Sequence, residues 1–168
     1  MTNLAEASWD TEGACELKQA AILLPGFRSA CESLMPYAKL YYHATWSTKQ
    51  REPLIDADRA SLITRSVRDS CERMGVHCHA VGMVADHNHV AVSIPPKLAV
   101  ADVIARLKGS SSHLVRNQSD GKPAFQWQAE YGVLTLTERA LPRVVLYINN
   151  QAEHHGNGST IAGLERFE

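Results

Sequence analysis

Apolar and polar residues alternate along four short stretches of the chain, and three longer stretches repeat their apolar residues every three or four positions. Alternation predicts β-strands, and the longer period predicts amphipathic α-helices. The predicted strands are residues 38–48, 76–84, 87–94 and 133–137. The predicted helices are residues 56–74, 98–118 and 138–155, with an interruption of the second at residues 109–112 and with Gly75 and Gly156 as stops for the first and the last. Pro142 favours the first turn of the last helix.

These elements follow one another as β-α-β-β-α-β-α. The first six predict an α+β fold of the ferredoxin-like type, β-α-β-β-α-β, in which helices cover an antiparallel sheet. The final helix is additional to that pattern, so it needs a reason of its own. We expect residues 37–155 to form one domain and residues 156–168 to be a short tail that frays.

Residues 1–36 differ in charge from the rest of the chain. They carry a formal charge of −3, whereas the remaining residues carry +2. A short apolar patch in this segment is broken by Pro25 and Gly26. We expect an acidic N-terminal extension outside the domain, either a short helix or a poorly ordered leader.

The overall composition narrows the classes of function. Hydrophobic residues make up 45% of the 168, enough for a packed core. A net charge of −1 argues against nonspecific coating of DNA, although it is compatible with a local basic groove. The four cysteines contain no CxxC pair, and the sequence shows neither an apolar run of about 18 residues nor a signal peptide. We therefore expect a cytoplasmic protein with no membrane partner.

The third predicted strand carries a histidine pair that could hold a metal. His87 and His89 point to the same face, about 7 Å apart at a rise of about 3.3 Å per residue. Two imidazoles at this spacing can converge on one divalent ion; the simpler alternative is a pair of histidines on a half-exposed strand. Asn88 points to the opposite face. There we expect a hydrogen-bond partner or a solvated edge for its amide, because burying an unpaired amide costs about 1–3 kcal/mol.

The last predicted helix carries Tyr147 and Gln151, one turn apart on the same face. An amide oxygen is a hard ligand that suits Mg²⁺ or Mn²⁺. A tyrosine can attack a phosphodiester when a metal neutralises the developing charge. On spacing alone, a core tyrosine with its hydroxyl at the edge is the simpler interpretation.

Two distant segments thus offer matching chemistry, and the sequence strings around them are specific. The chain contains, in order, YYHATWSTKQREPLI, ADHNHVAVSIPPKLAVADVIARLKGSSS, FQWQAEYG and YINNQAEHH. Across roughly residues 38–155 it resembles the single-tyrosine HUH transposases of the insertion-sequence 200/605 type. In that family the middle residue of the histidine motif is hydrophobic, so Asn88 is a departure.

The resemblance implies a reaction and roles for the residues. His87, His89 and Gln151 would hold Mg²⁺ or Mn²⁺, and Tyr147 would attack single-stranded DNA at the hairpin-bearing end of a mobile element. The product would be a 5′-phosphotyrosine link, later reversed to rejoin strands. Such proteins often form homodimers. The extra leader and the short tail leave open whether Tyr147 serves its own histidines or those of a partner subunit.

DNA contacts are expected from basic, polar and aromatic residues in and near the family strings. The candidates are Lys97, Arg106, Lys108, Ser110, Trp127 and Tyr131. The alternatives are a core position for Trp127 and simple solvation of the charged side chains.

Other interpretations stand beside the transposase. A zinc site would combine Cys71, Cys78 or His77 with His87, although their spacing fits no zinc pattern. A domesticated module would bind DNA hairpins without cleaving them. A replication or relaxation initiator would share the chemistry, but usually in a larger chain. Asp86, just before the histidine pair, is expected either to orient a ligand histidine or to serve the turn.

Overall fold

The computed structural model describes residues 37–118 and 124–165, so the predicted leader at residues 1–36 lies outside the described residues. The elements in chain order are β1 (Tyr41–Ser47), the 3₁₀ turn η1 (Lys49–Arg51), α3 (Ala57–Met74), β2 (His77–Met83), β3 (His87–Ser93), α4 (Val100–Asn117), β4 (Gly132–Leu136), α5 (Leu141–Asn149) and α6 (Gln151–Asn157). The predicted strands are all present, with ends that shift by a few residues.

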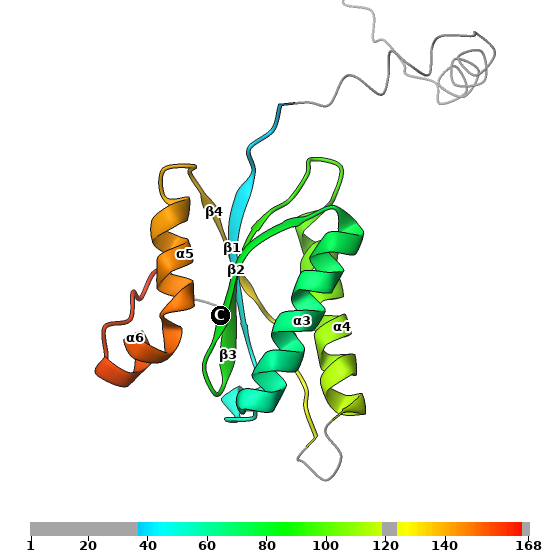
Figure 1. Cartoon of the computed structure of the whole chain (residues 1–168), viewed down its shortest axis with the longest axis vertical. Coiled ribbons are helices and arrows are strands. Elements are labelled where there is room, and N and C mark those ends of the chain that lie inside the picture. Colours follow the sequence, from blue (N-terminus) through cyan, green and yellow to red (C-terminus); the bar gives the residue numbers. More distant parts are fainter. Residues whose placement is uncertain (1–36, 119–123, 166–168) are drawn as a thin grey trace, which may run out of the picture. The chain divides into compact units, whose positions relative to one another are not determined.

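The strands form an antiparallel sheet in the order β2-β3-β1-β4. This order confirms the ferredoxin-like α+β fold. Figure 1 shows α3 and α4 on one side of the sheet, and α5 with α6 on the other. The main core lies under α3 and α4, and Trp46, Val90 and Ile104 are among its buried side chains. A smaller apolar cluster lies under α5 and contains Ala80, Ala91, Val144 and Ile148.

The ends of α3 follow directly from its sequence. The Asp56 carboxylate accepts a hydrogen bond from the backbone N–H of Arg59 at 2.9 Å and so caps the N-terminus. Gly75 ends the helix in the left-handed conformation, with a φ of 68°. The predicted helix at residues 56–74 is therefore confirmed at both ends.

The predicted interruption of α4 at residues 109–112 is wrong. The helix runs unbroken because Ser111 donates its hydroxyl to the Leu107 carbonyl at 2.7 Å, which satisfies the serine within the helix. A Cβ added at Gly109 would meet no atom within 4 Å, so this glycine marks no bend or close contact. Among the described residues, no helix has the length and apolar character that crossing a bilayer requires.

The last predicted helix is divided into α5 and α6. At the division, Asn150 donates its backbone N–H to the carbonyls of Leu146 and Tyr147, at 3.2 Å each. The second part ends at Gly158, with a left-handed φ of 72°, rather than at the predicted Gly156. The additional helix of this fold is thus two short helices that meet at an asparagine.

Close packing brings α5 onto the sheet at Gly82 of β2. A Cβ added at Gly82 would lie 1.9 Å from the carbonyl oxygen of Ile148 and 2.9 Å from its Cγ2. Atoms cannot approach so closely, so this position requires a glycine. Because Ile148 directly follows Tyr147, the contact also fixes the height of Tyr147 above the sheet.

Asn88 lies on the opposite face of β3, toward α3 and α4, together with Val90 and Val92. It is fully buried, and its amide nitrogen and oxygen have no hydrogen-bond partner in the part of the chain that the structure describes. The expectation of a partner or a solvated edge is therefore wrong. The strand alternation places the side chain inside the main core, opposite Trp46 of β1.

Replacing Gly82 with alanine should push α5 away from the sheet. We expect the free energy of unfolding to fall by about 3 kcal/mol, at the upper end of the usual penalty for overpacking, as measured by urea denaturation. Gly109→Ala is the matched control, because open space and a helix interior should make it stabilising by about 0.5–1 kcal/mol. Equal effects of the two substitutions would contradict the close contact.

Replacing Asn88 with valine removes a buried amide that has no partner. We expect the free energy of unfolding to rise by about 1–3 kcal/mol, measured by thermal or urea denaturation. Asn117→Val, at the exposed end of α4, should change it by no more than about 0.5 kcal/mol. A less stable Asn88→Val variant would show that the amide is paired after all.

Candidate active site

The histidine pair lies in the interior of the sheet. β3 is hydrogen-bonded to β1 on one side and to β2 on the other. His87 and His89 are both fully buried on the face toward α5, with ring centroids 5.1 Å apart. The predicted shared face of the pair is confirmed, and the alternative of half-exposed histidines is wrong.

A neighbouring side chain engages the Nδ1 atom of each histidine. His87 Nδ1 lies 2.6 Å from Oδ1 of Asp86, whose other oxygen accepts a hydrogen bond from Nε of Arg51 at 3.0 Å. His89 Nδ1 lies 2.9 Å from Nε2 of His43, and these two rings stack at 5.1 Å. With each Nδ1 engaged, both Nε2 atoms are the ones presented to a ligand. Asp86 thus makes the orienting contact that was one of its two expected roles.

Burial and charge set the protonation of these supporting groups. Burial and the neighbouring His89 lower the pKa of His43 to about 4, so His43 is neutral near pH 7 and can accept from His89. Burial raises the pKa of Asp86, but hydrogen bonds from His87 and Arg51 outweigh it and hold that pKa below its usual value. The Asp86 carboxylate is therefore charged while it orients His87.

The helices α5 and α6 carry the other predicted residues. Tyr147 is 4% exposed, and its ring lies 6.2 Å from the ring of His89 of the same chain. Gln151 is 1% exposed, and neither polar atom of its amide has a hydrogen-bond partner within residues 37–118 and 124–165. His154 stacks on the Tyr147 ring at 4.6 Å. The structure therefore brings the tyrosine to the histidine pair from the additional helix.

Residues 159–165 of the predicted tail return to these residues. The Tyr147 hydroxyl donates to Oε1 of Glu165 and accepts from the backbone N–H of Ile161 at 3.1 Å. Oε2 of Glu165 faces the Nε2 atoms of His87 at 3.1 Å, of His89 at 3.4 Å and of His155 at 3.5 Å. Sequence reasoning missed Glu165 entirely. His155 could have been found, because it continues the four-residue spacing of Tyr147 and Gln151.

The contacts of Glu165 change two pKa values. Burial raises the pKa of the Tyr147 phenol, and the hydrogen bond to Glu165 raises it further. Burial also opposes ionisation of Glu165, but His87, His89 and Tyr147 outweigh burial and keep the pKa of this carboxyl far below its usual range. The resting arrangement therefore pairs a neutral tyrosine with a charged glutamate.

The cluster could hold a divalent metal. One ligand atom from each of His87, His89, His155 and Glu165 lies within 4.8 Å of the others. Imidazole nitrogens and carboxylate oxygens are common metal donors. The fully buried Nε2 of His89 faces the carboxylate of Glu165 at 3.4 Å, so it is directed into the cluster as a ligand position requires. The donors present thus fit a metal ion.

The alternative zinc site is wrong. His77 pairs with Ser93 at one end of β3, whereas His87 begins the strand at its other end. Neither Cys71 nor Cys78 belongs to the cluster of possible ligands around His87. The cysteines and the histidine pair therefore do not form one site.

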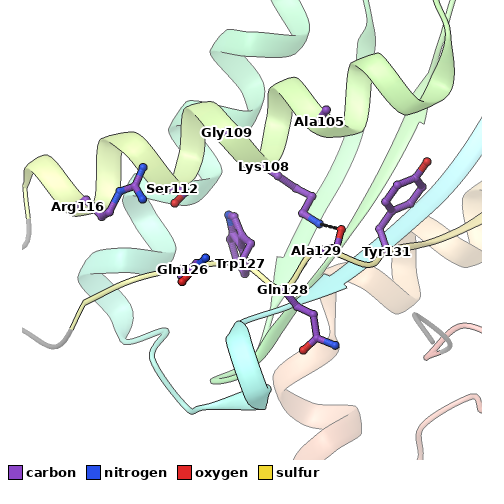
Figure 2. A pocket seen from close by; sticks show the side chains of 10 residues that line it. All are labelled: Ala105, Lys108, Gly109, Ser112, Arg116, Gln126, Trp127, Gln128, Ala129 and Tyr131. Carbon is purple, nitrogen blue, oxygen red and sulfur yellow. Dashed lines mark hydrogen bonds between the residues drawn. The ribbon is translucent and has the colours of Figure 1, made fainter.

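A cavity of about 360 Å³ lies between α4 and the segment that leads to β4. Figure 2 shows Lys108 and Tyr131 on its wall, and Lys108 donates to the carbonyls of Ala129 at 2.8 Å and Glu130 at 3.0 Å. Trp127 also lines it, but this residue is 6% exposed and packs edge-on against Trp46. Trp127 is therefore buried in the core, as the alternative interpretation of this residue expected.

The remaining DNA-binding candidates lie outside this cavity. Lys97 and Arg106 are exposed, and Ser110 shares a hydrogen bond of 2.9 Å with Ser70 of α3. The cavity adjoins the end of the sheet that carries the histidine pair, because Trp127 bridges to Thr48 directly after β1. The three described candidates on the cavity wall are thus Lys108, Trp127 and Tyr131.

Known transposases resemble this chain in sequence. A family model described as "Transposase IS200 like" matches residues 36–151. The ISDra2 transposase TnpA of Deinococcus radiodurans is 26% identical over 121 residues, which cover 67% of this chain and 84% of that protein. The transposase for insertion sequence element IS200 of Salmonella typhimurium is 27% identical over 126 residues, with 72% and 82% covered.

Solved structures show the same fold. A crystal structure of a protein from Deinococcus radiodurans assigned as a transposase aligns with a TM-score of 0.55 at 26% identity, covering 69% of this chain and 93% of that one. A REP-associated tyrosine transposase bound to a REP hairpin aligns with a TM-score of 0.55 at 15% identity, covering 72% of each chain. The family match spans the β3 histidines, Tyr147 and Gln151, and it covers more than half of the sequence. The chain belongs to the IS200-like transposase family.

Proposed function

We propose that this transposase cleaves and rejoins single-stranded DNA through a 5′-phosphotyrosine intermediate on Tyr147, with a divalent metal held by His87, His89 and Gln151. The family supplies the general activity, DNA cleavage and strand transfer. One observation carries the finer assignment: the Tyr147 hydroxyl and the Nε2 atoms of His87 and His89 converge on the same carboxylate. A nucleophile and metal donors that share one small anion can also share a phosphate.

The reaction balances without an external energy source. The Tyr147 oxygen forms a bond to phosphorus and gives up its proton, while the bond from phosphorus to the 3′ oxygen breaks and that oxygen takes up a proton. Attack by a 3′-hydroxyl on the phosphotyrosine reverses the step and joins strands. The metal, when bound, neutralises charge on the scissile phosphate. Asp86 and His43 orient the two histidines, and burial of Tyr147 limits competing attack by water.

The DNA path proposed here crosses the end of the sheet next to the histidine pair. A protein with this fold binds a REP hairpin, and we propose a hairpin at the end of a mobile element as the substrate here. Lys108 and Tyr131 offer a cation and an aromatic face on one cavity wall, which suits a phosphate and an unstacked base. Lys97, Arg106, Ser110 and Trp127 are the further proposed DNA contacts. The protein would act on cytoplasmic DNA as a homodimer.

Tyr147→Phe should abolish the covalent product. The substrate is labelled single-stranded DNA from either flank of the gene, carrying its hairpins, with Mg²⁺ or Mn²⁺ present. We expect a denaturation-resistant protein–DNA adduct from the unsubstituted chain and from Tyr42→Phe, a control on the opposite face of the sheet. An undiminished adduct from Tyr147→Phe would disprove the assigned nucleophile. Tight hairpin binding without cleavage in any tested metal would favour a binding module.

Tyr131→Ala should weaken DNA binding while leaving the fold intact, because the side chain is exposed at the cavity. Loss of base stacking predicts about 1–3 kcal/mol, or roughly 5- to 150-fold in Kd, measured by fluorescence anisotropy with the same hairpin DNA in EDTA. Tyr37→Ala, which is 86% exposed and does not belong to the residues that line the cavity, is the control and should leave Kd unchanged. Identical Kd values for the two variants would place the DNA elsewhere.

A further inference from the structure

We propose that His155 and Glu165 are ligands of the metal held by His87 and His89, so that the ion fastens the C-terminal segment, residues 159–165, over Tyr147. The inference rests on the metal dependence in the proposed function. Both added ligands lie beyond the residues that the family model matches, which end at position 151. The family match therefore does not supply them.

The spacing of the donor atoms fits one shared ion. Oε2 of Glu165 lies 3.1, 3.4 and 3.5 Å from the Nε2 atoms of His87, His89 and His155. Ligand atoms bound at about 2.0–2.2 Å around one cation lie about 3.0–3.5 Å from their neighbours. The three spacings from Glu165 are thus those of adjacent ligands, and all four donor atoms lie within 4.8 Å of one another.

The orientation of the rings points the same way. Asp86 engages Nδ1 of His87, and His43 engages Nδ1 of His89, so the Nε2 atom of each ring is the one directed at the carboxylate of Glu165. A cation bound between these atoms would attract the carboxylate and the nitrogen lone pairs together. Nε2 of His89 is fully buried and lies 3.4 Å from Oε2 of Glu165, so a shared ion would complete a contact that is long for a direct hydrogen bond.

The types of donor atom in the proposed site also predict which metal it binds most tightly. Three imidazoles and one carboxylate are richer in nitrogen than the oxygen-dominated sites typical of Mg²⁺. Mn²⁺ and Zn²⁺ accept imidazole more readily, and Zn²⁺ ranks above Mn²⁺ in affinity. We therefore expect the site to bind either ion more tightly than Mg²⁺. Gln151, whose buried amide is unpaired among the described residues, is available as a fifth ligand.

Fastening the tail has a consequence for the reaction. Oε1 of Glu165 holds the Tyr147 hydroxyl while Oε2 faces the histidines, so one carboxylate contacts both the nucleophile and the metal position. A scissile phosphodiester needs these same two contacts. The fastened tail is therefore a resting state, and DNA must displace Glu165 from the metal before Tyr147 can attack.

The affinity of the protein for a metal tests the proposed ligands and does not depend on DNA cleavage. Calorimetric titration of the full chain with Mn²⁺ should give a Kd at least tenfold weaker for Glu165→Ala and for His155→Ala than for the unsubstituted protein. Glu153→Ala on α6 and His113→Ala on α4 are the matched controls, because both residues are exposed and outside the cluster. We expect them to stay within twofold. Mn²⁺ affinities of Glu165→Ala and His155→Ala equal to the controls would overturn the proposal.

Hydrogen exchange and cleavage test the fastening itself. Mn²⁺ should slow amide exchange in residues 159–165 of the unsubstituted chain by at least tenfold, and should have no such effect in Glu165→Ala. In saturating Mn²⁺, Glu165→Ala should form the DNA adduct several-fold faster than Glu153→Ala. Metal-independent exchange in the unsubstituted tail, or a slower Glu165→Ala variant, would overturn the resting-state role. A failure of the Tyr147→Phe prediction would leave the calorimetry and the exchange fully interpretable.

Discussion

The contact between α5 and Gly82 is the constraint on which the site depends. The sheet face under α5 offers a small apolar cluster, with Ala80 and Ala91 contributed by the strands. Small side chains bury little apolar area, so the helix gains its contacts by coming close to the sheet. Gly82 permits this approach, because the carbonyl of Ile148 occupies the place of a side chain. The same geometry lowers Tyr147, the proposed nucleophile, to the level of the histidines.

The two faces of β3 serve different purposes. Toward α3 and α4, Val90 and Val92 join the main core, which supplies most of the buried apolar surface. Toward α5, the strand and its neighbour β1 bury His43, Thr45 and His89. Buried polar groups are costly unless paired, and several here have atoms without a hydrogen-bond partner in the described parts of the chain. Next to the proposed catalytic residues, such unpaired groups are typical of a place where a ligand completes the structure.

Local pattern could predict the fold and half of the site. Strand alternation identified the His87–His89 face, apolar spacing identified the extent of α3, and Gly75 identified its end. The sequence pattern gave wrong predictions at positions whose structure depends on contacts with distant parts of the chain. Gly109 and its serines look like a break, yet α4 absorbs them, and Asn88 alternates into a core that offers its amide no partner among the described residues. Those outcomes depend on what packs around each residue, and the spacing of apolar residues along the sequence carries no information about those neighbours.

Glu165 shows the same limit most clearly. Acidic residues are usually solvated, and nothing local distinguishes this one from Glu153. Its place in the site follows from the turn that carries the chain from Gly158 back to Tyr147, where the Ile161 N–H binds the phenol oxygen. The contact joins residues 18 positions apart through a bend set by a left-handed glycine. Glu165 thus becomes a site residue because the path of the backbone brings it back to Tyr147.

A ligand on a tail differs from a ligand on a strand in how readily it can be exchanged. Moving His87 or His89 would break hydrogen bonds to both neighbouring strands. Glu165 lies in a segment outside the helices and strands, residues 159–165, and such segments open at far smaller free energies than a central strand. A phosphate can therefore replace the carboxylate while the histidines stay fixed. Because Glu165 also holds Tyr147, the same exchange would uncover the proposed metal position and the proposed nucleophile together, so the proposed mechanism makes the tyrosine reactive only when DNA is in place.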